Sequence, residues 1–271
     1  HSYSHHPVPD RIKLLLRASD VCVRLGRYTP AYDYGIQAKA LLAKWPGAPA
    51  ETVAAIETHL STCAQRAGNI TLSTRHTRNA YNLLAGNPRL SPERLYRLSS
   101  AMGASMWYAA KNDSAYYYYS KALEAVALID SSPLNRFYRP ALIKNNIAGV
   151  YGQDGKSTEA IGAMRDVIRL TRLYLASGDT LKKDDGLEME LEAFDNLAGI
   201  YKTLGDYTRA QRLLEFSFAR KQQRFEAGTA LWYKSKILLG QLYVAQHQYE
   251  KAEQYLLEGL AAVRQEGGPP N

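Results

Sequence analysis

One residue pattern recurs six times along the chain and limits the folds that it can adopt. In each copy, two small residues stand twelve positions apart, and a turn lies between them. Because this distance is constant, each copy is predicted to be a hairpin whose two helices cross at the small pair. The six pairs are Ser19 and Ala31, Ser61 and Ser73, Gly103 and Ala115, Ala148 and Ala160, Ala198 and Ala210, and Gly240 and Ala252.

The links between the copies vary in length, whereas the hairpins do not. Successive first small residues are 42, 42, 45, 50 and 42 positions apart. Four turns contain a Gly where a helix must end, at Gly26, Gly68, Gly155 and Gly205. We therefore expect a tail over 1–8, an array over 9–266 and a linker or tail over 267–271. The expected hairpins lie near 9–46, 50–86, 92–130, 133–177, 186–226 and 227–266.

These residues resemble the tetratricopeptide repeat family. The match is strongest in the last two copies and holds less fully in the third and fourth, while the first two depart from it. They carry Ser at the first small position, and Thr77 stands at a usual aromatic position. The matching residues are Gly103, Ala115, Tyr119, Ala122; Ile147, Ala148, Tyr151, Gly155, Ala160; Leu197, Ala198, Tyr201, Gly205, Tyr207, Ala210; Leu239, Gly240, Tyr243, Tyr249 and Ala252.

The resemblance implies an all-α fold, an α-solenoid of about six helical hairpins in a right-handed superhelix with the first helices on the concave face. The units exceed the usual 34 residues and look like those of kinesin light chains and bacterial signalling proteins. The run Tyr116–Tyr119 with its neighbours looks like repeats of the Bacteroidetes type. There, such arrays often precede a histidine kinase, a DNA-binding module or a caspase-like CHAT peptidase.

Charge is distributed unevenly along the chain. Residues 1–150 hold 18 Lys and Arg against 9 Asp and Glu, whereas residues 151–271 hold 16 against 17. A basic half attracts acidic partners, although a solvated surface accounts for the same charges. No nucleic-acid-binding motif and no apolar run of membrane-spanning length occurs. The expected partner is therefore a protein or peptide segment, acidic where it meets this half, without nucleic acid or a membrane span; a homodimer stays open.

Sequence motifs that suggest chemistry have simpler explanations. Gly155-Lys156-Ser157 lacks the glycine that a P-loop needs five positions earlier, where Val150 stands. His59 and Cys63 are four apart on one helix, which makes at most a partial metal site with Cys22. A disulfide between the two cysteines stays open, and buried free thiols are the simpler interpretation. We expect no cofactor, no metal and no catalytic group.

Polar residues at positions that face the concave groove are the candidate binding site. Asn146 and Asn196 both stand two positions before their small residue, and a ladder of such amides can hold a peptide backbone. Bridging between adjacent helices is the alternative role. The family's clamp for a peptide carboxylate is incomplete here, because the sixth copy is mostly neutral or apolar at these positions. The candidate groove residues are Arg24, Arg66, Trp107, Tyr108, Asn145, Asn146, Gln153, Asp195, Asn196, Lys202, Lys234 and Gln241.

The expected function is non-catalytic binding of a protein or peptide segment in that groove. The alternative is a sensory or regulatory input region of a larger bacterial signalling protein, with a histidine kinase or a CHAT peptidase as the output. The compartment stays open between cytoplasm and periplasm; a membrane-bound sensor fragment would favour the periplasm.

Overall fold

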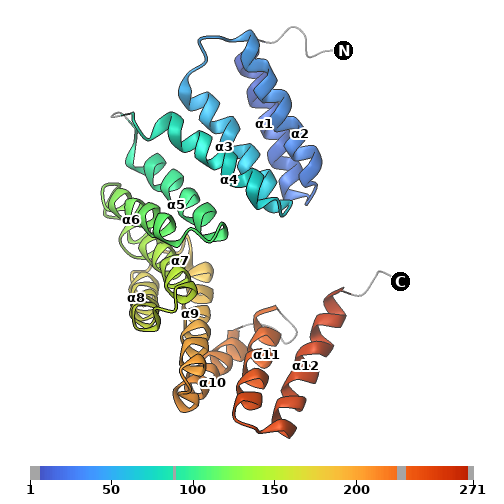
Figure 1. Cartoon of the computed structure of the whole chain (residues 1–271), viewed down its shortest axis with the longest axis vertical. Helices are drawn as coiled ribbons and strands as arrows, with labels where there is room; N and C mark the ends of the chain where they lie inside the picture. The colour runs from blue at the N-terminus through green and yellow to red at the C-terminus, as the bar shows by residue number, and fades with distance from the viewer. Residues whose placement is uncertain (1–6, 88–89, 225–229, 268–271) are drawn as a thin grey trace. The chain divides into compact units, whose positions relative to one another are not determined.

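A computed structural model describes residues 7–87, 90–224 and 230–267, which fall into two compact units divided after Asp130. The described part of the N-terminal unit consists of three helical hairpins and one short 3-10 helix, η2 (Leu42–Lys44). Figure 1 shows the hairpins as successive antiparallel pairs. Their helices are α1 (Val8–Arg24), α2 (Tyr28–Leu41), α3 (Ala50–Arg66), α4 (Ile70–Leu84), α5 (Pro92–Tyr108) and α6 (Asn112–Val126).

The C-terminal unit, in its described residues, also consists of three hairpins, preceded by a short π-helix, η3 (Leu134–Tyr138). Its helices are α7 (Arg139–Gln153), α8 (Ser157–Ala176), α9 (Lys183–Thr203), α10 (Tyr207–Arg224), α11 (Ala230–Ala245) and α12 (Tyr249–Gly267). The described residues contain no strand, so the all-α prediction of six hairpins is confirmed. The single array over 9–266 stays a prediction, and the expected tails fall mostly outside the described residues.

Small residues bring the two helices of each hairpin together, as the spacing predicts. In α1 the Ser19 hydroxyl donates to the Ala31 carbonyl at 2.8 Å, and in α3 the Ser61 hydroxyl donates to the Ser73 carbonyl at 3.1 Å. At Gly103 an added Cβ would lie 2.6 Å from the ring of Tyr119, which is fully buried. The crossing therefore allows no larger residue without rearrangement.

Every hairpin turns at the same place, seven residues after its first small residue. The residue there has a positive φ in all six turns: four are Gly, and the other two are Ala110 at 53° and His247 at 58°. The amide of this residue and the amide of the next one bond back to the preceding helix, as Gly205 N–H to Lys202 O and Asp206 N–H to Tyr201 O show. This is the left-handed helix cap that glycine favours, because other residues place a Cβ against the backbone there.

We expect Ala110→Gly to stabilise the protein by about 1 kcal/mol, because Gly relieves the cost of a left-handed L-residue. The reverse change, Gly205→Ala, should destabilise it by a similar amount, roughly 1 kcal/mol. Steric contact plays no part at Gly205, since an added Cβ would meet nothing within 4 Å. Urea unfolding of each variant measures the change.

Gly152→Ala is the control for these turn variants, because Gly152 is helical and an added Cβ there is also uncrowded. Ala should then stabilise the helix by roughly 0.5–1 kcal/mol. Equal effects of the same sign at Gly205 and Gly152 would contradict the conformational explanation.

The link between α8 and α9, residues 177–182, is shorter than its sequence indicates. The acidic and basic run Lys182–Asp185 suggests a solvated loop up to Gly186, but α9 already begins at Lys183. Gly186 packs against Tyr174, whose hydroxyl accepts a hydrogen bond from the Lys182 amide at 2.8 Å. Among the described helices, none is both long and apolar enough to cross a lipid bilayer.

Candidate functional site

A cavity of about 310 Å³ lies on the N-terminal unit among α3, α4 and α5. Small apolar residues form part of its walls, and they include Ala54, Ala80, Ala101 and Ala104. The hydroxyl groups of Ser61, Ser73 and Thr77 also line it, and they bond to one another. None of the twelve candidate groove residues borders this cavity.

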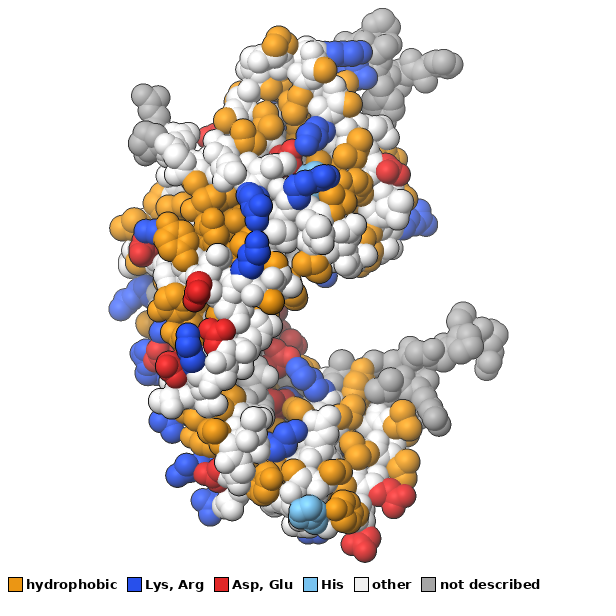
Figure 2. Space-filling model, viewed as in Figure 1, with side chains coloured by type: hydrophobic (Ala, Val, Ile, Leu, Met, Phe, Trp, Pro, Cys, Tyr) orange, Lys and Arg blue, Asp and Glu red, His pale blue; other side chains and the backbone are white. Residues whose placement is uncertain are grey.

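Two arginines at the start of α5 border the same cavity, and no sequence motif distinguishes them. Arg94 Nη1 donates to Glu51 Oε2 at 2.7 Å, so this ion pair joins α5 to α3. Arg97 Nε donates to Glu93 Oε1 at 3.0 Å along α5 itself. Figure 2 shows that Lys and Arg side chains lie among apolar ones on this unit.

A second, smaller cavity of about 100 Å³ lies between α1 and α3 and shares Thr58, His59 and Thr62 with the first. His59 Nδ1 lies 3.2 Å from Asp20 Oδ1. Cys63 contacts the Ser19 hydroxyl at 3.5 Å, and both cysteines are free. In the described residues, no group of three His, Cys, Asp or Glu is arranged to hold a metal ion.

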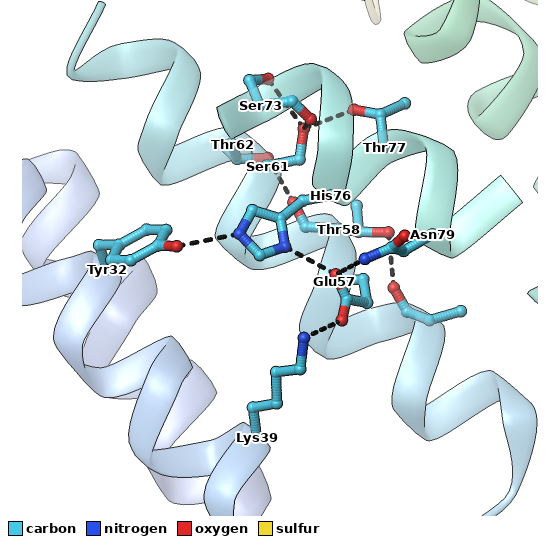
Figure 3. Close-up of polar contacts among 11 residues, drawn as sticks. Tyr32, Lys39, Glu57, Thr58, Ser61, Thr62, Ser73, His76, Thr77 and Asn79 are labelled. Carbon is cyan, nitrogen blue, oxygen red and sulfur yellow. Dashed lines mark hydrogen bonds and ion pairs between the residues drawn. The ribbon is translucent and has the colours of Figure 1, made fainter. Parts of the chain in front are cut away.

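A buried polar network joins the first two hairpins. Glu57, 3% exposed, accepts from Lys39 Nζ at 2.6 Å and bonds to His76 Nδ1 at 2.7 Å. Asn79 Nδ2 also donates to Glu57 at 3.2 Å, and the far nitrogen of His76 bonds to the Tyr32 hydroxyl at 2.9 Å. Figure 3 shows these side chains meeting between α2, α3 and α4. The network compensates one buried carboxylate, which would otherwise be costly.

Burial alone would raise the pKa of Glu57, but hydrogen bonds from Lys39, His76 and Asn79 outweigh it and lower that pKa. Because the pKa of Glu57 is lower in the folded state, its charged form stabilises the fold at every pH above the ordinary pKa of a glutamate. This stabilisation is lost as the pH falls through the folded-state pKa. We expect Glu57→Gln to cost roughly 2 kcal/mol at neutral pH, since hydrogen bonds to a charged group are lost. The difference between wild type and variant should shrink from about pH 5 to pH 3.

Thermal unfolding of both proteins across this pH range measures that difference. Glu124→Gln is the control, because Glu124 is exposed and its ion pair with Lys121 lies along one helix. It should change stability by less than about 0.5 kcal/mol. A difference between wild type and Glu57→Gln that does not vary with pH would rule out the charged network.

In the C-terminal unit, the two aligned asparagines lie on the first helices of two successive hairpins. Asn146 on α7 is half-buried and Asn196 on α9 is exposed. Within residues 131–224 and 230–267, neither side chain takes part in a hydrogen bond or an ion pair. The helices that carry them, α7 and α9, pack against each other. Within those ranges, neither side chain bridges adjacent helices by a hydrogen bond, and the binding role of both asparagines stays a prediction.

Asp195 was expected in the groove, and this prediction is wrong. Its side chain is 2% exposed and faces α10, where Lys221 Nζ donates to its Oδ2 at 2.5 Å. Lys221 is itself fully buried and also donates to the Ser235 hydroxyl on α11 at 2.8 Å. The Lys221 ammonium therefore joins α9, α10 and α11 inside the unit. Asp195 supplies the buried charged partner that a buried ammonium needs.

The other candidate residues lie at or near the surface of their own unit. Lys202 Nζ donates to Gln241 at 3.4 Å, which brings two of them together. Lys234 forms a 3.0 Å ion pair with Glu192. The rings of Trp107 and Tyr108 stack with centroids 5.5 Å apart. The remaining four are half-buried or exposed: Arg24, Arg66, Asn145 and Gln153.

No family model matches the chain, and no curated protein matches its sequence. Solved structures do match its fold. BtubC (BKLC) from P. vanneervenii is 22% identical, with a TM-score of 0.61 over 98% of this chain and 95% of that one. A Rap protein complexed with Competence and Sporulation Factor is 14% identical, with a TM-score of 0.66 over 93% and 65%.

A third similar structure is that of a signal transduction ATPase with numerous domains and a tetratricopeptide repeat sensor, from Pyrococcus horikoshii. It is 10% identical, with a TM-score of 0.71 over 95% of this chain and 37% of that one. Together with the six hairpins and their small-residue crossings, these likenesses show that the chain has the tetratricopeptide-repeat fold.

Proposed function

We propose that the chain is a non-catalytic scaffold that binds an extended protein or peptide segment on the first helices of its C-terminal hairpins. The observation that carries this proposal is the pair Asn146 and Asn196, equivalent in position and free of hydrogen bonds within the described residues of that unit. An amide side chain donates and accepts at once, so two aligned amides can pair with a peptide backbone. Main-chain pairing supplies affinity without reading side chains.

The likeness to the Rap protein supports this proposal, because that protein was solved with Competence and Sporulation Factor bound. Because residues 1–150 are basic, the proposed partner is acidic, since opposite charge steers association. Affinity for such a partner should then fall as salt is added, because exposed charges are screened.

The double variant Asn146→Ala/Asn196→Ala tests the proposal. Peptides are first selected against the wild-type chain from a displayed random library, and their affinities are measured by fluorescence polarisation. We expect the double variant to bind them about tenfold more weakly, since each lost hydrogen bond contributes roughly 0.5–1.5 kcal/mol. Thermal stability should not change, because surface substitutions away from packed features cost little.

Asn82→Ala is the matched control, because Asn82 is an exposed helical asparagine of the other unit. It should leave affinity unchanged. Wild-type affinity in the double variant, or equal losses in the control, would show that the asparagines do not hold the peptide.

A regulatory input role is the second candidate function. It is favoured by the likeness to the tetratricopeptide repeat sensor of the Pyrococcus horikoshii ATPase. In that role, ligand binding would alter the activity of an attached kinase or peptidase. Activity of a kinase or peptidase joined to this chain, measured with and without a selected peptide, would separate the two roles.

A further inference from the structure

The cavity among α3, α4 and α5 is separate from the asparagine pair, because it lies in the other unit. Its volume is about 310 Å³. An apolar cavity of about 150 Å³ can hold benzene, so this one has room for an apolar body about twice that size. One peptide side chain would fill only part of it. The size therefore fits a compact small molecule.

The walls favour an apolar ligand body. Ala54 and Ala80 are 1% exposed, and Leu84 and Leu98 complete the inner wall at 4% and 8%. Ala101 contributes a short side chain from α5. Small residues on facing helices leave space that larger residues would fill, and transfer of apolar surface from water into this space is favourable. The cavity also reaches α4, so it extends behind the first helices of the hairpins.

The rim favours a negative charge. A guanidinium has five N–H donors and stays charged. Arg94 and Arg97 each use one of these donors on a carboxylate, Glu51 and Glu93 respectively. Within residues 7–87 and 90–130, the two terminal nitrogens of Arg97 have no partner. This part of the chain holds fourteen Lys and Arg against nine Asp and Glu, so an anionic ligand also meets a favourable net charge.

We propose that this cavity binds a small amphipathic carboxylate, with its apolar body among the alanines and its carboxylate on Arg94 and Arg97. Arginine matches a carboxylate by two parallel hydrogen bonds, which a hydroxyl cannot accept in the same way. The site is thus expected to distinguish an acid from the alcohol of equal length.

Isothermal titration of the whole chain with octanoate and 4-phenylbutyrate tests the proposal, with octan-1-ol and 4-phenylbutan-1-ol as neutral counterparts. Each acid should bind one to one and at least about tenfold more tightly than its alcohol, because the charged hydrogen bonds distinguish them. Alcohols that bind as tightly as the acids would overturn the role of the arginines. The absence of saturable acid binding up to about 10 mM would overturn the site itself.

Variants locate the binding. Arg97→Gln should weaken acid binding about tenfold and leave alcohol binding unchanged, whereas Ala101→Phe should weaken both by filling the cavity. Arg78→Gln is the matched control, because Arg78 is an exposed arginine of α4 outside the cavity. Circular dichroism establishes whether each variant is folded. If Ala101→Phe does not fold, the result for Arg97→Gln alone tests the proposal. Unchanged acid binding in Arg97→Gln would overturn the proposal.

The same titration separates this site from the proposed peptide site. Asn146→Ala/Asn196→Ala should bind octanoate like wild type, whatever it does to peptides. Selected peptides should not compete with octanoate. Competition between them would show that the cavity is a pocket for a peptide side chain and that no separate small-ligand site exists.

Discussion

Lys221→Met is expected to destabilise the C-terminal unit by about 3–5 kcal/mol, because it leaves the Asp195 carboxylate buried without its charged partner. Lys221 and Asp195 are 0% and 2% exposed, and their atoms lie 2.5 Å apart. Met retains the length and apolar stem of Lys, so the decrease in the free energy of unfolding measures the effect of the missing charge. Urea unfolding followed by circular dichroism measures it.

A double variant separates the charge effect from packing. Lys221→Met/Asp195→Asn removes both charges and should recover at least half of the lost stability, because neutral replacement of a buried pair is often tolerated. Lys183→Met is the control, since Lys183 is an exposed lysine at the start of α9. It should change stability by less than about 0.5 kcal/mol. A double variant as unstable as Lys221→Met would assign the loss to packing alone.

Gly103→Leu is expected to destabilise the N-terminal unit by about 3 kcal/mol, because a buried crossing has no room for a side chain. The first atom alone would lie 2.6 Å from the ring of Tyr119, and that ring is fully enclosed. At Gly240 the neighbour is the half-buried Leu256, at 2.7 Å. A flexible side chain near the surface can shift, so Gly240→Leu should cost less, roughly 2 kcal/mol.

Gly162→Leu is the control for both crossing variants. Gly162 lies on the exposed side of α8, where an added Cβ meets nothing within 4 Å. Leu there should stabilise the helix by up to about 1 kcal/mol, because glycine is a poor helix former. Thermal unfolding ranks the three variants. A loss at Gly162 equal to that at Gly103 would contradict the steric explanation.

The hairpins could be predicted from the sequence because helix crossings and turns both depend on local spacing. The constant distance of twelve residues fixes where two helices can approach closely, and the structure confirms this at Ser19 and Gly103. The turns at Ala110 and His247 follow the same spacing although neither has glycine. Backbone hydrogen bonds thus outweigh the local preference of those two residues.

The polar pairs could not be predicted, because they join residues whose separation has no periodic pattern. Glu57 and His76 are 19 apart, and Asp195 and Lys221 are 26 apart. Asp195 stands three positions before Ala198, as Asn145 does before Ala148, but its side chain bonds to Lys221 of α10 inside the unit. A buried lysine cannot be recognised in the sequence, since most lysines are exposed.

The cavity is only partly visible in the sequence. Ala54, Ala80 and Ala101 are ordinary helix-forming residues, and nothing in their spacing indicates that they face one another. They do so because α3 and α5 both pack against α4, which is a property of the assembled unit. The position of Arg94 and Arg97 at the edge of the cavity likewise depends on the packing of these helices.

The uniform turns have a consequence for how such a chain can change length. Because each hairpin closes seven residues after its crossing, an insertion inside a hairpin would misalign its small pair. The link at residues 177–182 lies outside this constraint. Sequence added there leaves every crossing intact, so this link is a natural place to graft an affinity tag, a protease site or a foreign loop.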